Sequence, residues 1–283
     1  GALLALRDAN IQQPDAIITG TGMGCRQDSI AFLSKMLEND EQFVNPTQFI
    51  QSTHNTIGGQ IALNLGCQAY NTTYVQASAS LEASLIDGLL MTSENSENNN
   101  LLIGSIDEID DTYVQLYQRL GHVRKDAEAT GVIKSEGAGF FVCSVEKNEK
   151  SYAQLLDVEV KLKLDTNQVN TFVSKFLKKN QVAIEDIDAV VLGNNGDAQF
   201  DGYYHELQKN MFTETSQLHY KYLSGEHNSA SAFSLWLGCM ALKSQTIPKE
   251  FKPNNIDSLQ FKTIILYNQY RGTHHSLMLL ERT

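Results

Sequence analysis

Apolar residues recur along this chain in two spacings, one typical of helices and one typical of strands, and the two alternate. In the first half, a helical pattern over residues 2–9 precedes the β-branched run at 16–19, which predicts a strand. The glycine-rich loop Gly20–Gly24 follows. Apolar spacing over residues 28–37 then predicts a helix with Asp28 as its N-cap and its apolar face inward.

The second half repeats this alternation. An amphipathic helix is predicted at 167–179, a strand at 188–192, and two further strands at 263–267 and 276–280. The predicted helix at 229–243 is apolar on nearly every side, which is typical of a helix in the middle of a layered protein. The chain is therefore assigned to the α/β class.

The charge of the chain argues against two kinds of partner. Its 283 residues include 22 Lys and Arg against 33 Asp and Glu, a formal net charge of −11. The basic residues are scattered, whereas a nucleic-acid surface needs them clustered. An anionic membrane surface is disfavoured for the same reason. We therefore expect neither nucleic acid nor membrane as a partner.

The cysteines and the apolar stretches indicate a cytoplasmic location. Four cysteines lie far apart without CxxC pairing, which is typical of reduced thiols. The uncharged stretch 228–242 is too short for a membrane span, and the first residues contain no signal-peptide core. No cluster has the spacing of metal ligands, so no metal is expected.

The glycine-rich loop does not predict a nucleotide cofactor. Its spacing is GxGxG rather than GxGxxG, and no acidic residue ends a second strand at the distance that dinucleotide-binding folds require. No bound cofactor is expected.

A small-residue turn at Gln76–Ser80 joins the predicted strand 71–75 to an apolar helix. A strand, a tight turn and a buried helix can present a nucleophile at a helix N-terminus, where backbone N–H groups favour negative charge. Ser78 occupies that place. The alternative is that Ser78 or Ser80 only caps the helix.

The order of the motifs resembles the β-ketoacyl-acyl-carrier-protein synthases, the condensing enzymes of fatty-acid and polyketide synthesis with the thiolase fold. The similarity runs nearly end to end. Its matching segments are Gly20–Gly24, Asn55–Ala62, Asn71–Ser80, Glu136–Gly139, Asp188–Gly196, Lys221–Gly225 and Asn268–Thr273. The resemblance implies a five-layer α/β/α/β/α sandwich of two similar halves, residues 1–150 and 151–283, with the opening strand of the first half missing.

The resemblance also indicates which residues stand at the family's catalytic positions. Ser78 replaces the cysteine that carries the acyl chain, while Asn195 and Glu226 replace two histidines, and Lys221 is kept. A serine needs an adjacent base. Asn195 cannot shuttle a proton, and Glu226 carries the same charge as the enolate formed by decarboxylation. These changes predict a catalytically silent protein.

Two further segments are expected to bear on the site. A register slip of one residue would place His227 beside Ser78 as a base. Tyr270, Arg271 and Gly272 replace part of the family's flexible glycine loop, which suggests a plugged or rigid gate to an acyl tunnel also lined by Gln76. The nearby pair His274–His275 is expected to face solvent.

The function implied by this resemblance is a silent, chain-length-factor-like subunit of fatty-acid, polyketide or polyene synthesis. Its implied partners are an acyl carrier protein, whose phosphopantetheine thioester is the possible ligand, and an active ketosynthase or a second copy in a dimer. The first alternative is a divergent acyltransferase or ketosynthase that uses Ser78, assisted by Lys221 or His227. The second is a homodimeric protein that binds an acyl chain.

Overall fold

The computed structural model describes residues 1–42, 44–94, 100–124, 131–254, 256 and 260–283. It divides into two compact units. Unit 1 comprises residues 1–121, 134–146 and 227–229, and unit 2 comprises residues 122–133, 147–226 and 230–283. The division into halves at residue 150 remains a prediction. The units do not follow a single boundary in the sequence, because residues 122–133 belong to unit 2 and residues 227–229 to unit 1.

Unit 1 is built on a four-stranded sheet in the order β2-β1-β3-β4. Its strands are β1 (Ala16–Gly20), β2 (Tyr70–Tyr74), β3 (Asn100–Asp107) and β4 (Gly137–Ser144). Its helices are α1 (Ala2–Ala9), α2 (Arg26–Glu38), α3 (Pro46–Ser52), α4 (Thr56–Leu65), η1 (Ala77–Ala79), α5 (Ser80–Glu94) and α6 (Asp111–Arg119). β1 pairs in parallel with β2 and β3, whereas β4 is antiparallel to β3.

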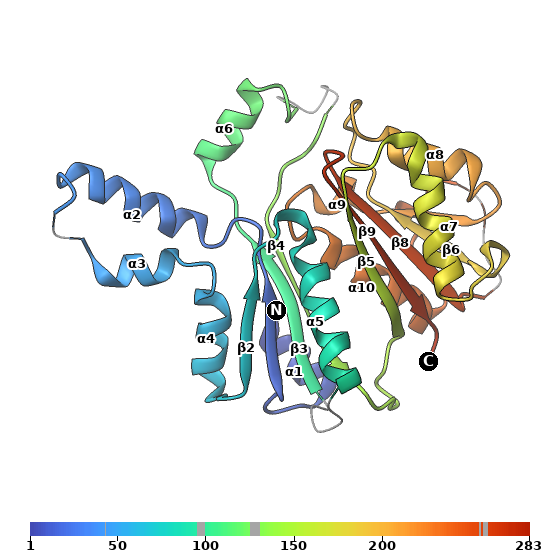
Figure 1. Ribbon diagram of the computed structural model, residues 1–283, viewed down its shortest axis with the longest axis horizontal. Coiled ribbons are helices and arrows are strands. Elements are labelled where there is room, and N and C mark those ends of the chain that lie inside the picture. The colour runs from blue at the N-terminus through green and yellow to red at the C-terminus, as the bar shows by residue number, and fades with distance from the viewer. Residues whose placement is uncertain (43, 95–99, 125–130, 255, 257–259) are drawn as a thin grey trace. The chain divides into compact units, whose positions relative to one another are not determined.

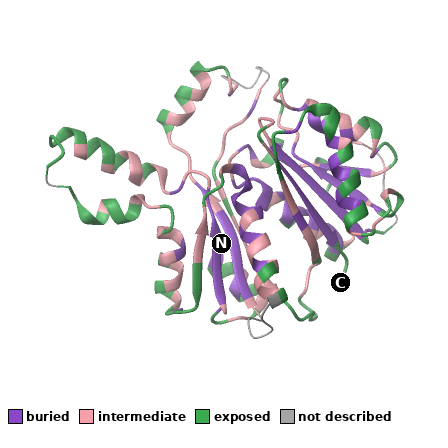
Figure 2. Ribbon diagram, viewed as in Figure 1, coloured by how far each residue is buried: buried purple, intermediate pink, exposed green. Residues whose placement is uncertain are grey.

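Alternate residues of β1 and β3 face opposite sides of this sheet, because side chains alternate along a strand. Ile17 and Leu102 pack with α1 and α4 in one buried cluster. On the other face α5 lies so close that a Cβ at Gly88 would contact Ile103. Figure 2 shows these strands as the most buried part of the unit.

Unit 2 contains a five-stranded sheet in the order β5-β9-β8-β6-β7. Its strands are β5 (Gln154–Leu162), β6 (Ala189–Leu192), β7 (Ser216–His219), β8 (Thr263–Tyr270) and β9 (His274–Glu281). Its helices are η2 (Thr166–Gln168), α7 (Val169–Lys179), η3 (Ile184–Asp186), α8 (Gly202–Asn210), α9 (Lys221–Ser224), α10 (Ser231–Ser244) and η4 (Lys249–Phe251). Among the described residues, the first sheet thus has four strands and the second has five.

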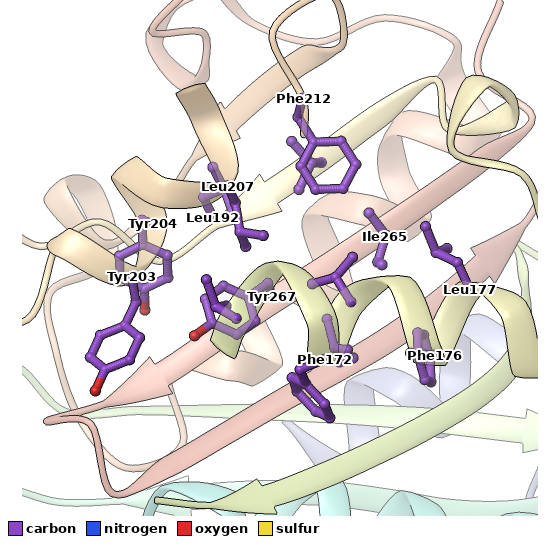
Figure 3. Packing of buried hydrophobic residues seen from close by; sticks show 14 of the residues in the cluster. Phe172, Phe176, Leu177, Leu192, Tyr203, Tyr204, Leu207, Phe212, Ile265 and Tyr267 are labelled. Atoms are coloured by element: carbon purple, nitrogen blue, oxygen red, sulfur yellow. The ribbon is translucent and has the colours of Figure 1, made fainter. Parts of the chain in front are cut away.

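The main core of unit 2 lies between the sheet and α7. Figure 3 shows aromatic residues of α7 and α8 packed over the strands, among them Phe172, Phe176 and Tyr204. α7 forms because its apolar residues recur at helical spacing, and five of its eleven residues are buried. α10 covers the opposite face, where a Cβ at Gly238 would contact Leu280.

The predicted first-half helix at 28–37 needs two corrections. α2 begins at Arg26, so its N-cap is Cys25 and not Asp28. Its apolar face is not buried: no residue of α2 is buried, and Leu37 is 71% exposed. The reason is that α2 packs on α3 instead of on the sheet (Figure 1). Among the described residues, no helix is both long and apolar enough to cross a membrane.

Candidate functional site

Ser78 is buried in a turn whose backbone is strained. β2 ends at Tyr74, and Ala77 then adopts a left-handed backbone with φ of 49°, which a residue with a side chain rarely does. Ser78 follows in η1 and is 4% exposed. Its Oγ has no hydrogen-bond partner among the described residues. Strain of this kind persists only where the surrounding structure enforces it.

Ser80 supplies the hydrogen bonds that hold this turn. Its Oγ accepts from the backbone N–H of Gln76 at 2.9 Å and lies 2.9 Å and 2.7 Å from the carbonyl oxygens of Thr21 and Ala77. The backbone of Gly20 packs against Ser80 so closely that a Cβ there would lie 2.5 Å from its carbonyl oxygen. Ser80, and not Ser78, therefore makes the side-chain hydrogen bonds that hold the turn at the start of α5.

A buried carboxylate that the sequence analysis missed holds the neighbouring glycine loop. Asp107, at the end of β3, accepts from the N–H groups of Gly22 at 2.9 Å and Met23 at 2.8 Å, and from the Thr21 hydroxyl at 3.2 Å. Ser229 also donates to it. Burial raises the pKa of Asp107, although these hydrogen bonds oppose the rise. Its position as the last residue of a buried strand was the available signal.

His227 belongs to unit 1, where it contacts β4 and the segment before it. Its Nδ1 lies 3.0 Å from the Ser135 hydroxyl, and a Cβ at Gly137 would lie 2.8 Å from its Nε2. No hydrogen bond joins His227 to Ser78, because the Ser78 hydroxyl has none with any described residue. The role of His227 as a base remains a prediction.

Three of the predicted residues meet in unit 2. Lys221 Nζ lies 2.8 Å from Glu226 Oε2, and Asn195 Nδ2 donates to the same oxygen at 2.6 Å. Lys221 is 1% exposed and Glu226 3%. A buried ion pair with an additional donor satisfies the charge of both partners. The Asn195 amide and the Lys221 ammonium are therefore both directed at Glu226.

The loop between β6 and α8 holds Asn195 in place. The N–H groups of Asn195 and Gly196 donate to the two oxygens of Asp201 at 3.2 Å and 2.9 Å. Burial raises the pKa of Asp201. A Cβ at Gly193 would lie 2.6 Å from the Tyr204 hydroxyl, so a larger residue would not fit there. The sequence analysis did not identify Asp201 either.

Around Lys221 lies a layer of neutral hydrogen-bonding groups. The hydroxyl of Tyr220 donates to Asn268 Oδ1 at 3.3 Å, and that of Tyr204 lies 3.5 Å from the same atom. Burial raises the pKa of Tyr204 well above its ordinary value of 10, so its hydroxyl stays protonated. Neutral hydrogen-bonding groups thus lie beside Lys221, and the Asp201 carboxylate is close enough to interact with its charge.

The predicted tunnel residues are divided between the units. Gln76 lies before η1 in unit 1, whereas Tyr270, Arg271 and Gly272 form the β8–β9 turn in unit 2. Gly272 N–H donates to Gln269 Oε1 at 3.0 Å, and the Gln269 amide donates to the Phe200 carbonyl at 3.2 Å. Arg271 Nη2 lies 3.0 Å from the His122 ring.

The expectation that both histidines of the His274–His275 pair face solvent is wrong for His275. His275 is 0% exposed because β9 lies between β5 and β8, with both faces of the sheet covered. Its Nδ1 lies 2.8 Å from the Tyr267 hydroxyl. Burial lowers the pKa of His275 to about 4. Among the described residues, no group of three or more potential metal ligands occurs.

Comparison with known proteins identifies relatives of this arrangement. The family model for the N-terminal domain of beta-ketoacyl synthases matches residues 23–189, more than half of the chain. None of the curated proteins matches the sequence.

Among solved structures, the ishigamide ketosynthase/chain length factor matches with a TM-score of 0.83 and 18% identity, over 100% of this chain and 80% of that one. The ketosynthase ApeO in complex with its chain length factor ApeC from Xenorhabdus doucetiae matches with a TM-score of 0.74 and 14% identity, over 96% and 75%. The complex AntDE:AntF, a type II polyketide synthase carrier protein with its ketosynthase bound to the hexaketide, matches with a TM-score of 0.79 and 14% identity, over 100% and 83%. The fold is therefore the thiolase-like fold of ketosynthases.

Proposed function

This chain belongs to the β-ketoacyl synthase family, and we propose that it is a silent condensing-enzyme subunit of the chain-length-factor type. The observation that carries this proposal is the contact of Glu226 with both Lys221 and Asn195, at 2.8 Å and 2.6 Å. Stabilisation of a developing oxyanion by one donor contributes about 3 kcal/mol to catalysis, and it requires donors that are free to bind that oxyanion. Here a carboxylate of the same charge occupies them.

The surroundings of Ser78 support the same proposal. A serine hydroxyl becomes a nucleophile when a base removes its proton, and the Ser78 Oγ makes no hydrogen bond with any described residue. The thiol of a cysteine would need less help, because its pKa of about 8.5 falls further at a helix N-terminus. In this proposal the chain retains the family's turn and helix, and Ser78 replaces the reactive cysteine.

The similar structures support the proposed partners. ApeO is a ketosynthase in complex with a chain length factor, and AntDE:AntF contains an acyl carrier protein with its ketosynthase. We propose that this chain associates with an active ketosynthase, and that the carrier's phosphopantetheine thioester is the ligand of the pair. The turn at Tyr270–Gly272, held by Gln269, is the proposed rigid gate of the acyl tunnel. A cytoplasmic location is part of the proposal.

One observation favours the alternative function. A buried hydroxyl that bonds to no described residue, on a strained turn before α5, is a suitable acceptor for an acyl group. In that case Ser78 attacks the thioester carbonyl, the acyl group passes to its oxygen, and the carrier thiol leaves with the proton. The base would be His227 after a rearrangement away from Ser135.

The two functions are separated by incubating the protein with an acyl-carrier-protein thioester and measuring intact mass. The silent subunit gains no acyl mass, and neither does Ser78→Ala. Ser78→Cys, the matched positive control, gains it because its thiolate is nucleophilic without a base. An acyl adduct on the wild type that Ser78→Ala loses would establish the acyltransferase instead.

A second measurement tests the partner. Co-expression with a cysteine-containing ketosynthase, followed by size-exclusion chromatography, is expected to give a complex that forms a condensation product only when the partner's cysteine is intact. A stable homodimer that binds free acyl chains and ignores the ketosynthase would contradict the proposal and indicate an acyl-binding protein.

A further inference from the structure

The backbone strain of the turn before α5 lies at Ala77 and not at Ser78. Ala77 has a φ of 49°, whereas Ser78 is not among the described residues with a positive φ. A positive φ presses the Cβ of a side chain against the neighbouring carbonyl oxygen, so glycine is the usual residue there. Hydrogen bonds hold the peptide groups on both sides: the Ala79 N–H donates to the Gln76 carbonyl at 3.0 Å, and the Ser80 N–H donates to the Ala77 carbonyl. Ala77 is therefore the residue at which the chain is forced to turn from β2 toward the helix.

The side chains of this turn become more buried along the chain. Gln76 is exposed, Ala77 is partly exposed, and Ser78 is only 4% exposed. The Ser78 Oγ, the atom that would have to react, is itself buried. A nucleophile must approach the carbonyl carbon of an acyl thioester closely and in the right direction, which an enclosed atom cannot do. The turn thus presents Ala77 to an incoming substrate and encloses Ser78.

The packing of α5 opposes any movement of Ser78 to the surface. Ser80, the first residue of the helix, lies so close to β1 that a Cβ at Gly20 would be 2.5 Å from the Ser80 carbonyl oxygen. The Ser80 Oγ also lies 2.9 Å from the Thr21 carbonyl oxygen. A rotation of the turn that exposed Ser78 would break these contacts and would pull the fully buried Leu81 toward solvent. The burial of Ser78 is therefore fixed by the fold.

We propose that Ala77 occupies the reactive position of this turn, the position from which a side chain could accept an acyl group, and that Ser78 lies behind it. A strained residue between a strand and a helix presents its side chain outward, in front of the helix N-terminus, which favours a nucleophilic anion. The methyl group of Ala77 has no electron pair with which to attack a carbonyl carbon. The acyl-accepting role of the position rests on the proposed function, which keeps its silent subunit while the missing nucleophile moves from Ser78 to Ala77.

The experiment compares Ala77→Cys with Ser78→Cys, which place the same thiol at neighbouring positions. Each variant is incubated with iodoacetamide and, separately, with octanoyl-N-acetylcysteamine, a small acyl thioester that needs no carrier protein. In the second reaction the cysteine thiolate attacks the thioester carbonyl carbon and the bond from that carbon to the N-acetylcysteamine sulfur breaks. The acyl group passes to the cysteine sulfur, and N-acetylcysteamine leaves as a thiol with the proton that the cysteine gave up.

The rate of each reaction is measured by intact mass. Peptide mapping then separates the new thiol from the four cysteines of the wild type, which are Cys25, Cys67, Cys143 and Cys239. The same two variants in urea sufficient to unfold them are the control, because both thiols are then equally accessible.

The expected result is that Ala77→Cys reacts at least tenfold faster than Ser78→Cys with both reagents when the proteins are folded. Both variants gain acyl mass, but the buried thiol of Ser78→Cys gains it slowly. The two rates become equal in urea, since the difference arises from the fold. The thiol of Ala77→Cys also lies near a helix N-terminus, which increases its thiolate fraction.

A second pair of variants tests the strain at Ala77 without any thiol chemistry. Ala77→Gly should raise the midpoint of urea unfolding, because glycine adopts a positive φ without the clash that a side chain makes. Ala79→Gly is the matched control in the same short helix, where φ is not positive and the residue is 2% exposed. It should lower the midpoint, because glycine there only adds freedom to the unfolded chain.

Three results would overturn the assignment of Ala77. They are a folded Ser78→Cys that reacts as fast as Ala77→Cys, an Ala77→Cys that iodoacetamide labels but the thioester does not acylate, and an Ala77→Gly that loses as much stability as Ala79→Gly. All three concern the variants. The silent-subunit function is decided on the wild type, by the presence or absence of an acyl adduct, so either proposal can fail while the other stands.

Discussion

Lys221 and Glu226 form an ion pair in the interior of unit 2, with 2.8 Å between Nζ and Oε2 and both side chains almost fully buried. The two residues lie at the start of α9 and just beyond its end, so one turn of helix and Gly225 bring the ammonium and the carboxylate together. Two charges removed from water stabilise each other only as long as both are present. Neither the Lys221 ammonium nor the Glu226 carboxylate would therefore be stable in this buried position without the other.

Removing one member of this pair is expected to destabilise the protein. Glu226→Gln leaves the Lys221 ammonium buried without its counter-charge, which costs about 3–5 kcal/mol of unfolding free energy. The double variant Glu226→Gln with Lys221→Met, which removes both charges and keeps an acceptor for Asn195, should recover most of that loss. Urea unfolding followed by circular dichroism measures both. A single variant as stable as the wild type would mean that the pair is not formed.

The two serines of the turn before α5 should respond oppositely to replacement by alanine. Ser78→Ala removes a buried hydroxyl that has no hydrogen-bond partner in the described part of the chain, so stability should stay the same or rise by up to about 1 kcal/mol. Ser80→Ala removes the acceptor of the Gln76 N–H and a donor to a neighbouring carbonyl, and should cost about 1–3 kcal/mol. Thermal unfolding of the two alanine variants compares their stabilities. Equal losses in both variants would show that Ser78 is hydrogen-bonded after all.

The glycine loop should loosen when Asp107 is shortened. Asp107→Ala leaves the N–H groups of Gly22 and Met23 without their acceptor, at a cost of about 1–3 kcal/mol for a buried donor. Amide hydrogen exchange at those two residues should become faster, while exchange in α7 of unit 2 stays unchanged. Asp107→Asn is the control, because its amide oxygen can still accept. Unchanged hydrogen exchange in Asp107→Ala would show that the Asp107 carboxylate does not support the glycine loop.

The protein should become less stable in mild acid through His275. Burial lowers its pKa from 6.5 to about 4, so between those values the unfolded chain binds a proton that the folded chain does not. This contribution to stability is fully present above pH 6.5 and is lost as the pH falls toward 4. At about 1.4 kcal/mol per pH unit, the loss between pH 6.5 and pH 5 is about 2 kcal/mol.

Urea unfolding at about pH 7 and about pH 5 tests this dependence. His275→Gln should reduce the difference in stability between the two conditions, because glutamine does not titrate. The difference in stability will not vanish, because burial also lowers the pKa of His219 to about 4. His54→Gln, at an exposed position, serves as the control. An unchanged difference in His275→Gln would contradict the burial of a neutral imidazole.

Local patterns were sufficient to predict most of the elements. The helical spacing of Phe172, Val173 and Phe176 predicted α7, and the β-branched run before Gly20 predicted β1, because a helix or strand is already marked by the period of its apolar residues. The failure of the same reasoning at α2 is instructive. Its apolar spacing was read correctly as a helix, yet the sheet does not cover that helix, and a period alone cannot say what lies opposite an apolar face.

The sequence by itself determined the order of the elements and the net charge of −11, and its resemblance to the family predicted that Ser78, Asn195 and Glu226 stand at the catalytic positions. Only the tertiary structure decided that Glu226 binds Lys221 and Asn195, that Asp107 holds the glycine loop and that His275 is buried. The physical reason is that period and residue type are local properties. Burial, pairing and pKa depend on atoms that distant segments of the chain place within a few ångströms.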